Sequence, residues 1–179
     1  MPKPYYTVQT FKPGTSIGFL MKRCGVLMTQ IAERHFESTS VSFIQWSTLM
    51  RLCAQAGHMS ATQLSRELGY DMGALTRVVD ELERRGLVRR ERSRRDRRAV
   101  EIAVTSAGRR QADSAKPVVV ELLNELLEPY SEAEIATFIE LTQRMLVRLQ
   151  DFAAATAADP APVPQVPHPR RKPKSGAAA

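Results

Sequence analysis

The chain has 179 residues, of which 43% are hydrophobic, and a formal net charge of +7. This composition fits one globular domain with a core and loose ends, and the sequence predicts neither a membrane span nor a secretory signal. Its two cysteines, Cys24 and Cys53, cannot build a disulfide framework, so we expect a cytoplasmic protein with no membrane partner.

The chain begins with an arm that is followed by two predicted helices. Residues 1–14 contain three prolines and no helical period, which predicts a flexible N-terminal arm. Apolar side chains then recur with helical spacing from Ile17 to Ile31, in a helix expected over about residues 15–36. A second apolar stripe starts at Trp46 and ends near Gly57.

Two short helices are predicted next, each with a recognisable start and end. Ser60–Gln63 has the spacing of a capping box, and Gly69 is placed to end the helix that it opens. Asp71 can cap the following helix, which would end before Gly86. Together they predict a helix-turn-helix over about residues 60–86. The apolar positions that its second helix would bury are Leu75, Val78, Val79 and Leu82.

The apolar period then changes from helical to alternating, as is typical of strands. Val100, Ile102 and Val104 alternate with other residues, and residues 87–92 supply an antiparallel partner. We therefore predict a two-stranded β wing over about residues 87–104.

Two longer helices complete the predicted domain over about residues 105–153. Pro117 is expected to break or kink the first helix, and Ser131–Glu134 is a capping box that opens the second. Residues 154–179 are rich in proline and basic side chains, which predicts a disordered tail. The predicted fold class is mainly α, a winged helix-turn-helix lobe with helical dimerisation regions at residues 15–36 and 105–153.

The positive charge of the chain is concentrated in one window. Between Arg84 and Arg98, nine of fifteen residues are arginine and only Glu91 and Asp96 are acidic, so the window alone carries +7. Such a run is usually a solvated face or a tail, but here apolar residues interrupt it in a regular pattern. Concentrated positive charge steers anionic partners, and the phosphate backbone of duplex DNA is the commonest of them.

A short helix followed by a basic hairpin suits the reading of double-stranded DNA. An α-helix fits the major groove, and Arg77 is the only long donor in the first two turns of the second short helix. Gly73 and Ala74 are small, so the backbone can approach the groove closely, while arginines at the hairpin tip would reach the adjacent minor groove. The predicted DNA-binding residues are Thr62, Gln63, Met72, Gly73, Ala74, Thr76, Arg77, Arg84, Arg94, Arg95, Asp96, Arg97 and Arg98.

The segment LGYDMGALTRVVDELERRGLVRR resembles the recognition-helix region of the MarR family of bacterial transcription regulators, and DRRAVEIAVTSAG resembles that family's wing. The resemblance covers roughly residues 15–153. It implies that Arg77 enters the major groove, that Arg97 enters the minor groove, and that Asp96 and Arg98 shape the wing. It also implies a homodimer whose terminal helices intertwine, and hence a pseudo-palindromic operator.

The resemblance further implies a small aromatic or phenolic effector, because relatives often bind aromatic acids between the first, second and fifth helices. Residues that would line such a site are His35, Trp46, Met50 and Arg51. A tryptophan such as Trp46 is more often an anchor of the core. Both cysteines lie on apolar helical stripes, where a buried and inert thiol is the usual state.

No metal, cofactor or catalytic site is predicted. The three histidines show no ligand spacing with each other or with a cysteine, and no nucleophile–base or phosphate-binding motif is present. We therefore predict a non-enzymatic, dimeric, sequence-specific transcriptional regulator, a repressor released by a small aromatic ligand. The alternatives are a redox-responsive regulator acting through Cys24 or Cys53, and a non-specific architectural DNA-binding protein.

Overall fold

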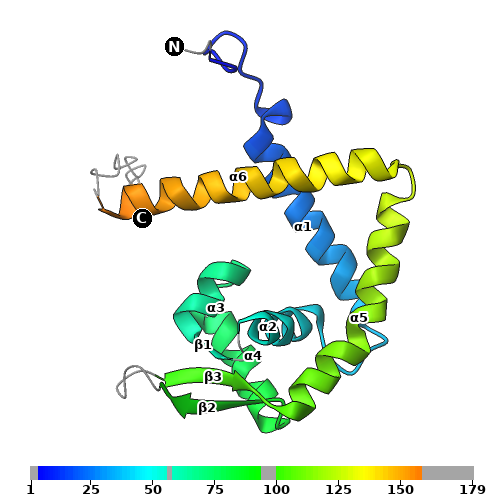
Figure 1. The fold of residues 1–179 in the computed structure, drawn as a ribbon, viewed down its shortest axis with the longest axis vertical. Helices are drawn as coiled ribbons and strands as arrows, with labels where there is room; N and C mark the ends of the chain where they lie inside the picture. Colours follow the sequence, from blue (N-terminus) through cyan, green and yellow to red (C-terminus); the bar gives the residue numbers. More distant parts are fainter. Residues whose placement is uncertain (1–3, 56–57, 94–99, 159–179) are drawn as a thin grey trace, which may run out of the picture. The chain divides into compact units, whose positions relative to one another are not determined.

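The computed structural model describes residues 4–55, 58–93 and 100–158 of the chain. In these ranges it contains six α-helices, one short 3-10 helix and three strands (Figure 1). The chain divides into two units, Met1–Leu127 and Glu128–Ala179. The first unit holds every strand and five of the helices, and the second holds the last helix, so the mainly helical fold class is confirmed.

The N-terminal arm has more local structure than the sequence predicts for residues 1–14. Residues 7–11 form a hydrogen-bonded turn, and a 3-10 helix, η1 (Pro13–Thr15), follows it. The hydroxyl of Tyr6 accepts a hydrogen bond from the N–H of Ile17 at 3.1 Å. The prolines did not prevent ordered turns, because a proline at the first position of a helical turn has the φ angle that the turn needs.

A carboxylate from the first helix is hydrogen-bonded to the start of the second helix. The two helices are α1 (Ile17–Phe36) and α2 (Phe43–Ala54), the latter opened by a capping box at Ser42. The carboxylate of Glu33, from α1, accepts hydrogen bonds from two backbone N–H groups in the first turn of α2, at 3.2 and 3.3 Å. These N–H groups have no partner within a helix, so Glu33 fixes the start of α2 against α1.

The helix-turn-helix consists of α3 (Ala61–Leu68) and α4 (Met72–Arg84), and its predicted helix ends are confirmed. Ser60 and Gln63 form the expected capping box before α3. Gly69 and Gly86 end the two helices with φ angles of 72° and 69°, a left-handed conformation that costs other residues energy.

The sheet has three antiparallel strands, one more than predicted. β2 (Val88–Arg92) and β3 (Val100–Val104) pair with Arg90 opposite Ile102, which is the expected wing. A short strand, β1 (His58–Ser60), pairs with the other edge of β3. Three residues are too few to show an alternating pattern, so nothing in the sequence indicated β1.

The core lies where α2, α3 and α4 meet the sheet and the first half of the next helix, α5 (Ser106–Leu127). Its most deeply buried side chains are Phe36, Leu49, Leu52, Leu64, Leu75, Val79, Leu82 and Val88. The predicted inward face of α4 is confirmed for Leu75, Val79 and Leu82, whereas Val78 is half-buried. α4 is therefore held against the lobe by one apolar face, and its opposite face is left outward.

Of the break or kink expected at Pro117, the break does not occur, because α5 runs through this residue without interruption. Buried side chains on both sides of the proline, Ala112, Ala115 and Leu122, hold the helix in place. Tertiary packing here outweighs the loss of one backbone hydrogen bond, a cost of roughly 3 kcal/mol.

The second unit is a single long helix, α6 (Glu132–Ala158). Its predicted start is confirmed, since the carboxylate of Glu134 accepts from the N–H of Ser131 at 2.9 Å. The helix continues past residue 153, where we expected disorder to begin, because the alanine-rich segment at its end has high helix propensity. No helix in the described part of the chain is long and apolar enough to cross a membrane.

Candidate nucleic-acid interface

Six of the thirteen DNA-binding residues that the sequence predicts lie on α4. Those of its side chains that are exposed are Met72, Gly73, Thr76, Arg77, Asp80 and Arg84, while Ala74 and Glu81 are half-buried at its edges. The carboxylate of Asp71 accepts from the N–H of Ala74 at 2.9 Å and caps the helix. The first turn of α4 is therefore fixed locally, with small side chains beside it.

Arg77 has a guanidinium group that is available to a ligand. It is exposed, and it forms no hydrogen bond or ion pair with any residue that the structure describes. Arg84, two turns further along, instead donates to the carboxylate of Glu81 at 2.9 and 2.7 Å. This hydrogen bond raises the pKa of Arg84 and lowers the pKa of Glu81. Arg77 and Arg84 were predicted alike, but their surroundings differ.

Arg90 joins the wing to the second helix of the helix-turn-helix. From β2, its guanidinium donates to Asp80 at 2.5 Å and to Glu83, and its backbone N–H donates to Glu83 at 2.8 Å. The hydrogen bond to Asp80 is the main cause of a raised pKa for Arg90. The sequence did not show this role, because the partners lie seven and ten positions away and nothing in the arginine run distinguishes Arg90.

Several arginines of the window are engaged by side chains within the fold, and Arg84 and Arg90 pair with carboxylates that lie outside the window. Besides the pairs of Arg84 and Arg90, Arg89 donates to Glu91 at 3.0 Å and Arg85 donates to Gln45 at 3.3 Å. The net charge of the window overstates the charge that is free to meet an anion. Among the described residues of the window, Arg92 is exposed and has no such partner.

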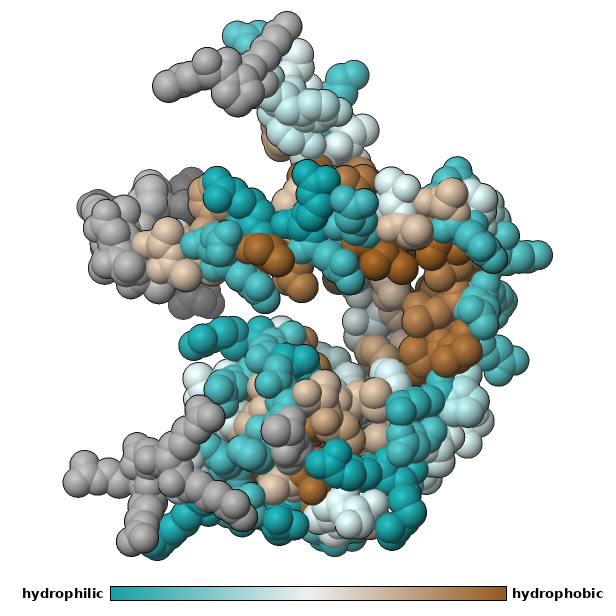
Figure 2. All heavy atoms as spheres, in the orientation of Figure 1, coloured by the Kyte–Doolittle hydropathy of each residue, from teal (hydrophilic) through white to brown (hydrophobic). Residues whose placement is uncertain are grey.

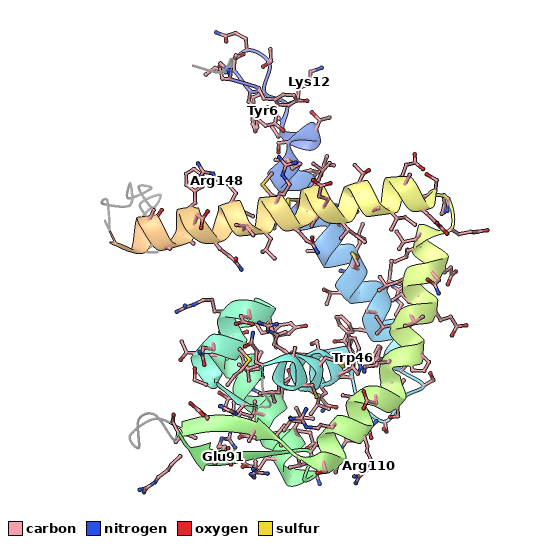
Figure 3. All side chains as sticks on the ribbon, viewed as in Figure 1. Tyr6, Lys12, Trp46, Glu91, Arg110 and Arg148 are labelled. Atoms are coloured by element: carbon pink, nitrogen blue, oxygen red, sulfur yellow. The ribbon has the colours of Figure 1, made fainter. Side chains whose placement is uncertain are left out.

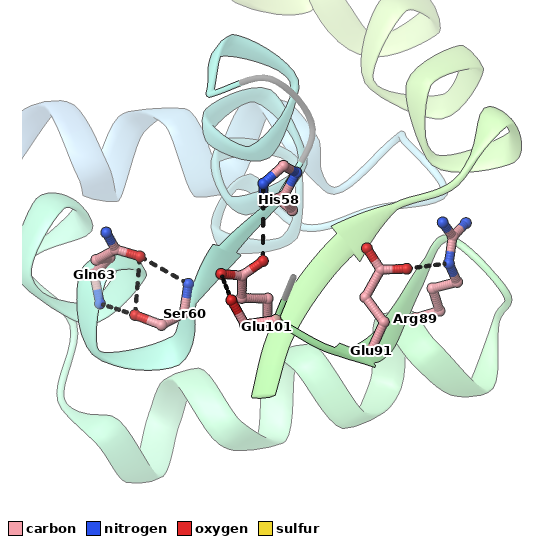
Figure 4. A network of polar contacts seen from close by, with 7 residues as sticks. His58, Ser60, Gln63, Arg89, Glu91 and Glu101 are labelled. Carbon is pink, nitrogen blue, oxygen red and sulfur yellow. Dashed lines mark hydrogen bonds and ion pairs between the residues drawn. The ribbon is translucent and has the colours of Figure 1, made fainter. Parts of the chain in front are cut away.

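The tip of the wing, with the predicted residues Arg94, Arg95, Asp96, Arg97 and Arg98, lies outside the described residues. The base of the wing is held by Glu101 of β3 (Figure 4). Its carboxylate accepts from the hydroxyl of Ser93 at 2.7 Å and lies 3.8 Å from Nε2 of His58. This network holds Ser93, directly after β2, to Glu101, at the start of β3.

The two residues predicted on α3 are both exposed, but only one is uncommitted. Thr62 has an exposed side chain, whereas the side-chain oxygen of Gln63 accepts from the N–H of Ser60 at 2.9 Å in the capping box (Figure 4). Gln63 therefore fixes the start of α3, and its side-chain amide has less freedom to meet a base or a phosphate.

Hydrogen bonds and a close backbone approach connect the segment after α4 to the start of α5. The hydroxyl of Thr105 donates to the carbonyl of Gly86 at 2.8 Å, and the N–H of Thr105 donates to the carbonyl of Leu87 at 3.0 Å. A Cβ atom on Gly108 would lie 2.1 Å from that carbonyl oxygen of Leu87. In the segment DRRAVEIAVTSAG, this glycine follows Thr105 by three residues, and the sequence alone gives no reason for that spacing. The reason is this close approach.

The residues predicted to line an effector site are largely engaged within the fold. The indole N–H of Trp46 donates to the carbonyl of Ala112 on α5 at 3.0 Å, and its ring packs against Phe36 and Phe43 (Figure 3). Arg51 forms an ion pair with Glu67 of α3. Met50 is half-buried against the core, and His35 is exposed. Trp46 thus serves as the core anchor that we had considered.

The two cysteines differ in their surroundings. Cys24 is exposed on α1 within the chain alone, where we expected a buried thiol, because α1 has no cover along that stripe in its own unit. Cys53 is half-buried on α2, and burial raises the pKa of its thiol, so its reactive thiolate form is suppressed at neutral pH. No group of metal-ligating side chains occurs in the described ranges.

A family model described as the MarR family matches residues 39–99, which span α2, the helix-turn-helix and the first wing strand. Among curated proteins, the chain is similar to an uncharacterised HTH-type transcriptional regulator of Bacillus subtilis, YdgJ. The two are 28% identical over 106 residues, which is 59% of this chain and 65% of that protein. The HTH-type transcriptional repressor YetL of the same organism is 25% identical over 126 residues, covering 70% of this chain and 75% of YetL.

Solved structures extend the similarity to the whole fold. A MarR-family transcriptional regulator from Rhodococcus sp. RHA1 is 29% identical with a TM-score of 0.63, covering 72% of this chain and 92% of that one. CouR from Rhodococcus jostii RHA1, solved with p-coumaroyl-CoA bound, is 27% identical with a TM-score of 0.62. That match covers 86% of this chain and 99% of CouR.

Proposed function

The chain belongs to the MarR family of winged helix-turn-helix transcriptional regulators, and on that premise we propose that it is a dimeric repressor of a pseudo-palindromic DNA operator. The observation that carries the proposal is the outward face of α4, where the guanidinium of Arg77, which has no partner among the described residues, lies beside small side chains. A guanidinium can donate two hydrogen bonds to the major-groove edge of guanine. A cytoplasmic location goes with this role, and no enzymatic activity is part of it.

A second copy of the chain is the proposed cover for apolar side chains on α1 and α6. In the single chain, Ile17 of α1 is 52% exposed, and Phe138 and Leu146 of α6 are 67% and 54% exposed. Brown apolar side chains lie along α6 in Figure 2. Exposed apolar surface of this extent usually marks an interface. Two-fold symmetry would then present two equivalent copies of α4 to the DNA, with half-sites about one helical turn apart.

The experiment that tests the function is a competition binding assay on DNA. Fragments selected by the protein from a random pool should share one pseudo-palindrome, preferred over unrelated duplex by roughly a thousandfold or more. Binding that is equally tight to all duplexes would support the architectural alternative instead. No measurable binding to duplex DNA at low salt would contradict the proposal altogether.

We also propose release by a small aromatic or phenolic acid, and the phenolic acyl group of the p-coumaroyl-CoA bound to CouR supports this by analogy. Such a compound must bind the form that cannot hold DNA more tightly than the form that can, since equal affinity would change nothing. Salicylate-like acids at millimolar concentration should weaken operator binding. The response should survive replacement of both Cys24 and Cys53 by serine.

The redox alternative makes the opposite prediction for the wild-type protein and the double serine variant. Cys24 is the thiol that an oxidant can reach in the single chain. If peroxide releases the wild-type protein, the double serine variant stays bound, and aromatic acids have no effect, then a thiol switch replaces the ligand switch.

A further inference from the structure

The outward face of α4 has little hydrogen-bonding capacity left beyond Arg77. Asp80 accepts from Arg90, and Arg84 is bonded to Glu81. The hydroxyl of Thr76 donates to the carbonyl of Met72 at 2.7 Å, so its proton is committed to the helix backbone. Polar groups on this face are therefore mostly satisfied within the protein, and Arg77 is its one arginine with no partner among the described residues.

What remains outward in the first two turns of α4 is apolar. The side chain of Met72 is 45% exposed, Thr76 is exposed with its γ-methyl group uncommitted, and Gly73 has no side chain. Residues one turn apart are neighbours on a helix surface, so the methionine thioether and the threonine methyl group adjoin each other. Arg77 lies immediately beside them in the sequence and on the same outward face.

We propose that Met72 and Thr76 read the C5-methyl group of a thymine next to the base pair that Arg77 contacts. In the major groove only thymine presents such a methyl group, and apolar side chains, including the methyl group of threonine, are its usual partners. The absence of a side chain at Gly73 leaves room for the base edge to approach. This inference rests on the proposed DNA-binding function and specifies which base α4 recognises besides guanine.

The test replaces thymine by uracil, which removes the methyl group and leaves base pairing unchanged. Once the operator has been selected, each thymine of one half-site is replaced in turn and the dissociation constant is measured. A single position, adjacent to the guanine whose recognition is lost in Arg77→Ala, should weaken binding roughly fourfold, as expected for one buried methyl group. The other replacements should have no effect.

Two variants of Thr76 assign the contact to its methyl group or to its hydroxyl. Thr76→Ser keeps the hydroxyl that donates to Met72 and removes the methyl group, so its preference for thymine over uracil should be smaller than that of the wild type, and the remainder is the contribution of Met72. Thr76→Val keeps a methyl group and lacks the hydroxyl, so it should still prefer thymine. Because residue 76 is exposed, both variants should keep the melting temperature of the wild type within about 2 °C.

The outcomes separate this inference from the proposed function. If the wild type has a preferred operator but no uracil replacement weakens binding, or no thymine adjoins that guanine, the inference is wrong and the function stands. A loss of the thymine preference in Thr76→Val, with its retention in Thr76→Ser, would also overturn it in favour of a hydrogen bond. If no preferred operator exists, the function and the inference fail together.

Discussion

Arg77 and Arg90 are only thirteen positions apart, yet their surroundings give them different tasks. Arg77 is exposed without a partner among the described residues, whereas Arg90 is bonded to two carboxylates of α4. An arginine that is already paired inside the fold, such as Arg90, holds structural elements in place. An unpaired arginine, such as Arg77, can contact DNA. Substitutions at the two sites should therefore be separable by measuring DNA affinity and stability independently.

Arg77→Ala should cost about 1–3 kcal/mol of operator affinity and relax the preference at one base pair per half-site. Arg77→Lys keeps the charge but lacks the two-pronged donor geometry, so it should lose the base preference and retain binding to unrelated duplex. The measurement is a dissociation constant on operator variants at fixed salt. Arg144→Ala, which removes the same charge from α6, is the control. Equal operator affinity for the wild type and Arg77→Ala would contradict the assignment of this face.

Arg90→Ala should lower the free energy of unfolding by about 1 kcal/mol, because its ion pairs are partly exposed and screened by solvent. It should also reduce DNA affinity, since β2 is then less firmly held against α4. The matched control is Arg92→Ala on the same strand, which should leave stability within about 0.5 kcal/mol of the wild type. Denaturant unfolding gives both values, and equal destabilisation by the two variants would show that the contacts of Arg90 are not specific.

At the scale of elements, the junction between Thr105 and Gly86–Leu87 fixes where α5 begins relative to the end of α4. Its geometry leaves no room for a side chain at Gly108, which is buried. The residues that follow α4 are thus hydrogen-bonded directly to the residue that precedes α5. A change in the direction of α5 should therefore also move the end of α4.

Gly108→Ala should destabilise the lobe by about 2 kcal/mol or more, because the new methyl group would overlap the backbone carbonyl of Leu87 and force the helix to shift. Gly14→Ala is the control, since a Cβ atom there meets no atom within 4 Å. Thermal unfolding of both variants gives the comparison. A stability of Gly108→Ala equal to that of the control would mean that the junction is looser than described.

The elements that the sequence predicted well are those whose signals are local. The caps at Ser60, Gly69 and Asp71 depend on residues within one turn, so their spacing was sufficient. β1 is too short to carry a period, and the continuation of α5 through Pro117 depends on packing from other elements. The pairing of Arg90 with Asp80 is likewise non-local. Which arginines of the window are free could be seen only once β2 was placed against α4.

At the scale of the whole molecule, the apolar side chains on α1 and α6 require a partner, and the proposed one is a second copy. Leu146→Asp should leave the fold of a single chain intact, because the residue is exposed there. It would place an unpaired charge at the helical interface, which is strongly unfavourable. We therefore expect a monomer with greatly weakened operator binding.

Light scattering and DNA binding measured on the same samples test this expectation. Gln143→Asp introduces the same charge elsewhere on α6, at an already polar position, and should remain dimeric. A wild-type mass equal to one chain, with operator binding intact, would rule out the dimer.

Trp46 gives the protein a built-in optical reporter. It is the only tryptophan in the sequence (Figure 3). Its indole N–H is bonded to the backbone of α5, and its ring packs against two phenylalanines. Its fluorescence emission should therefore shift to longer wavelength whenever α2 and α5 separate and water reaches the ring. An inducing compound that moves these helices apart can be followed in real time, without a label and without DNA in the cuvette.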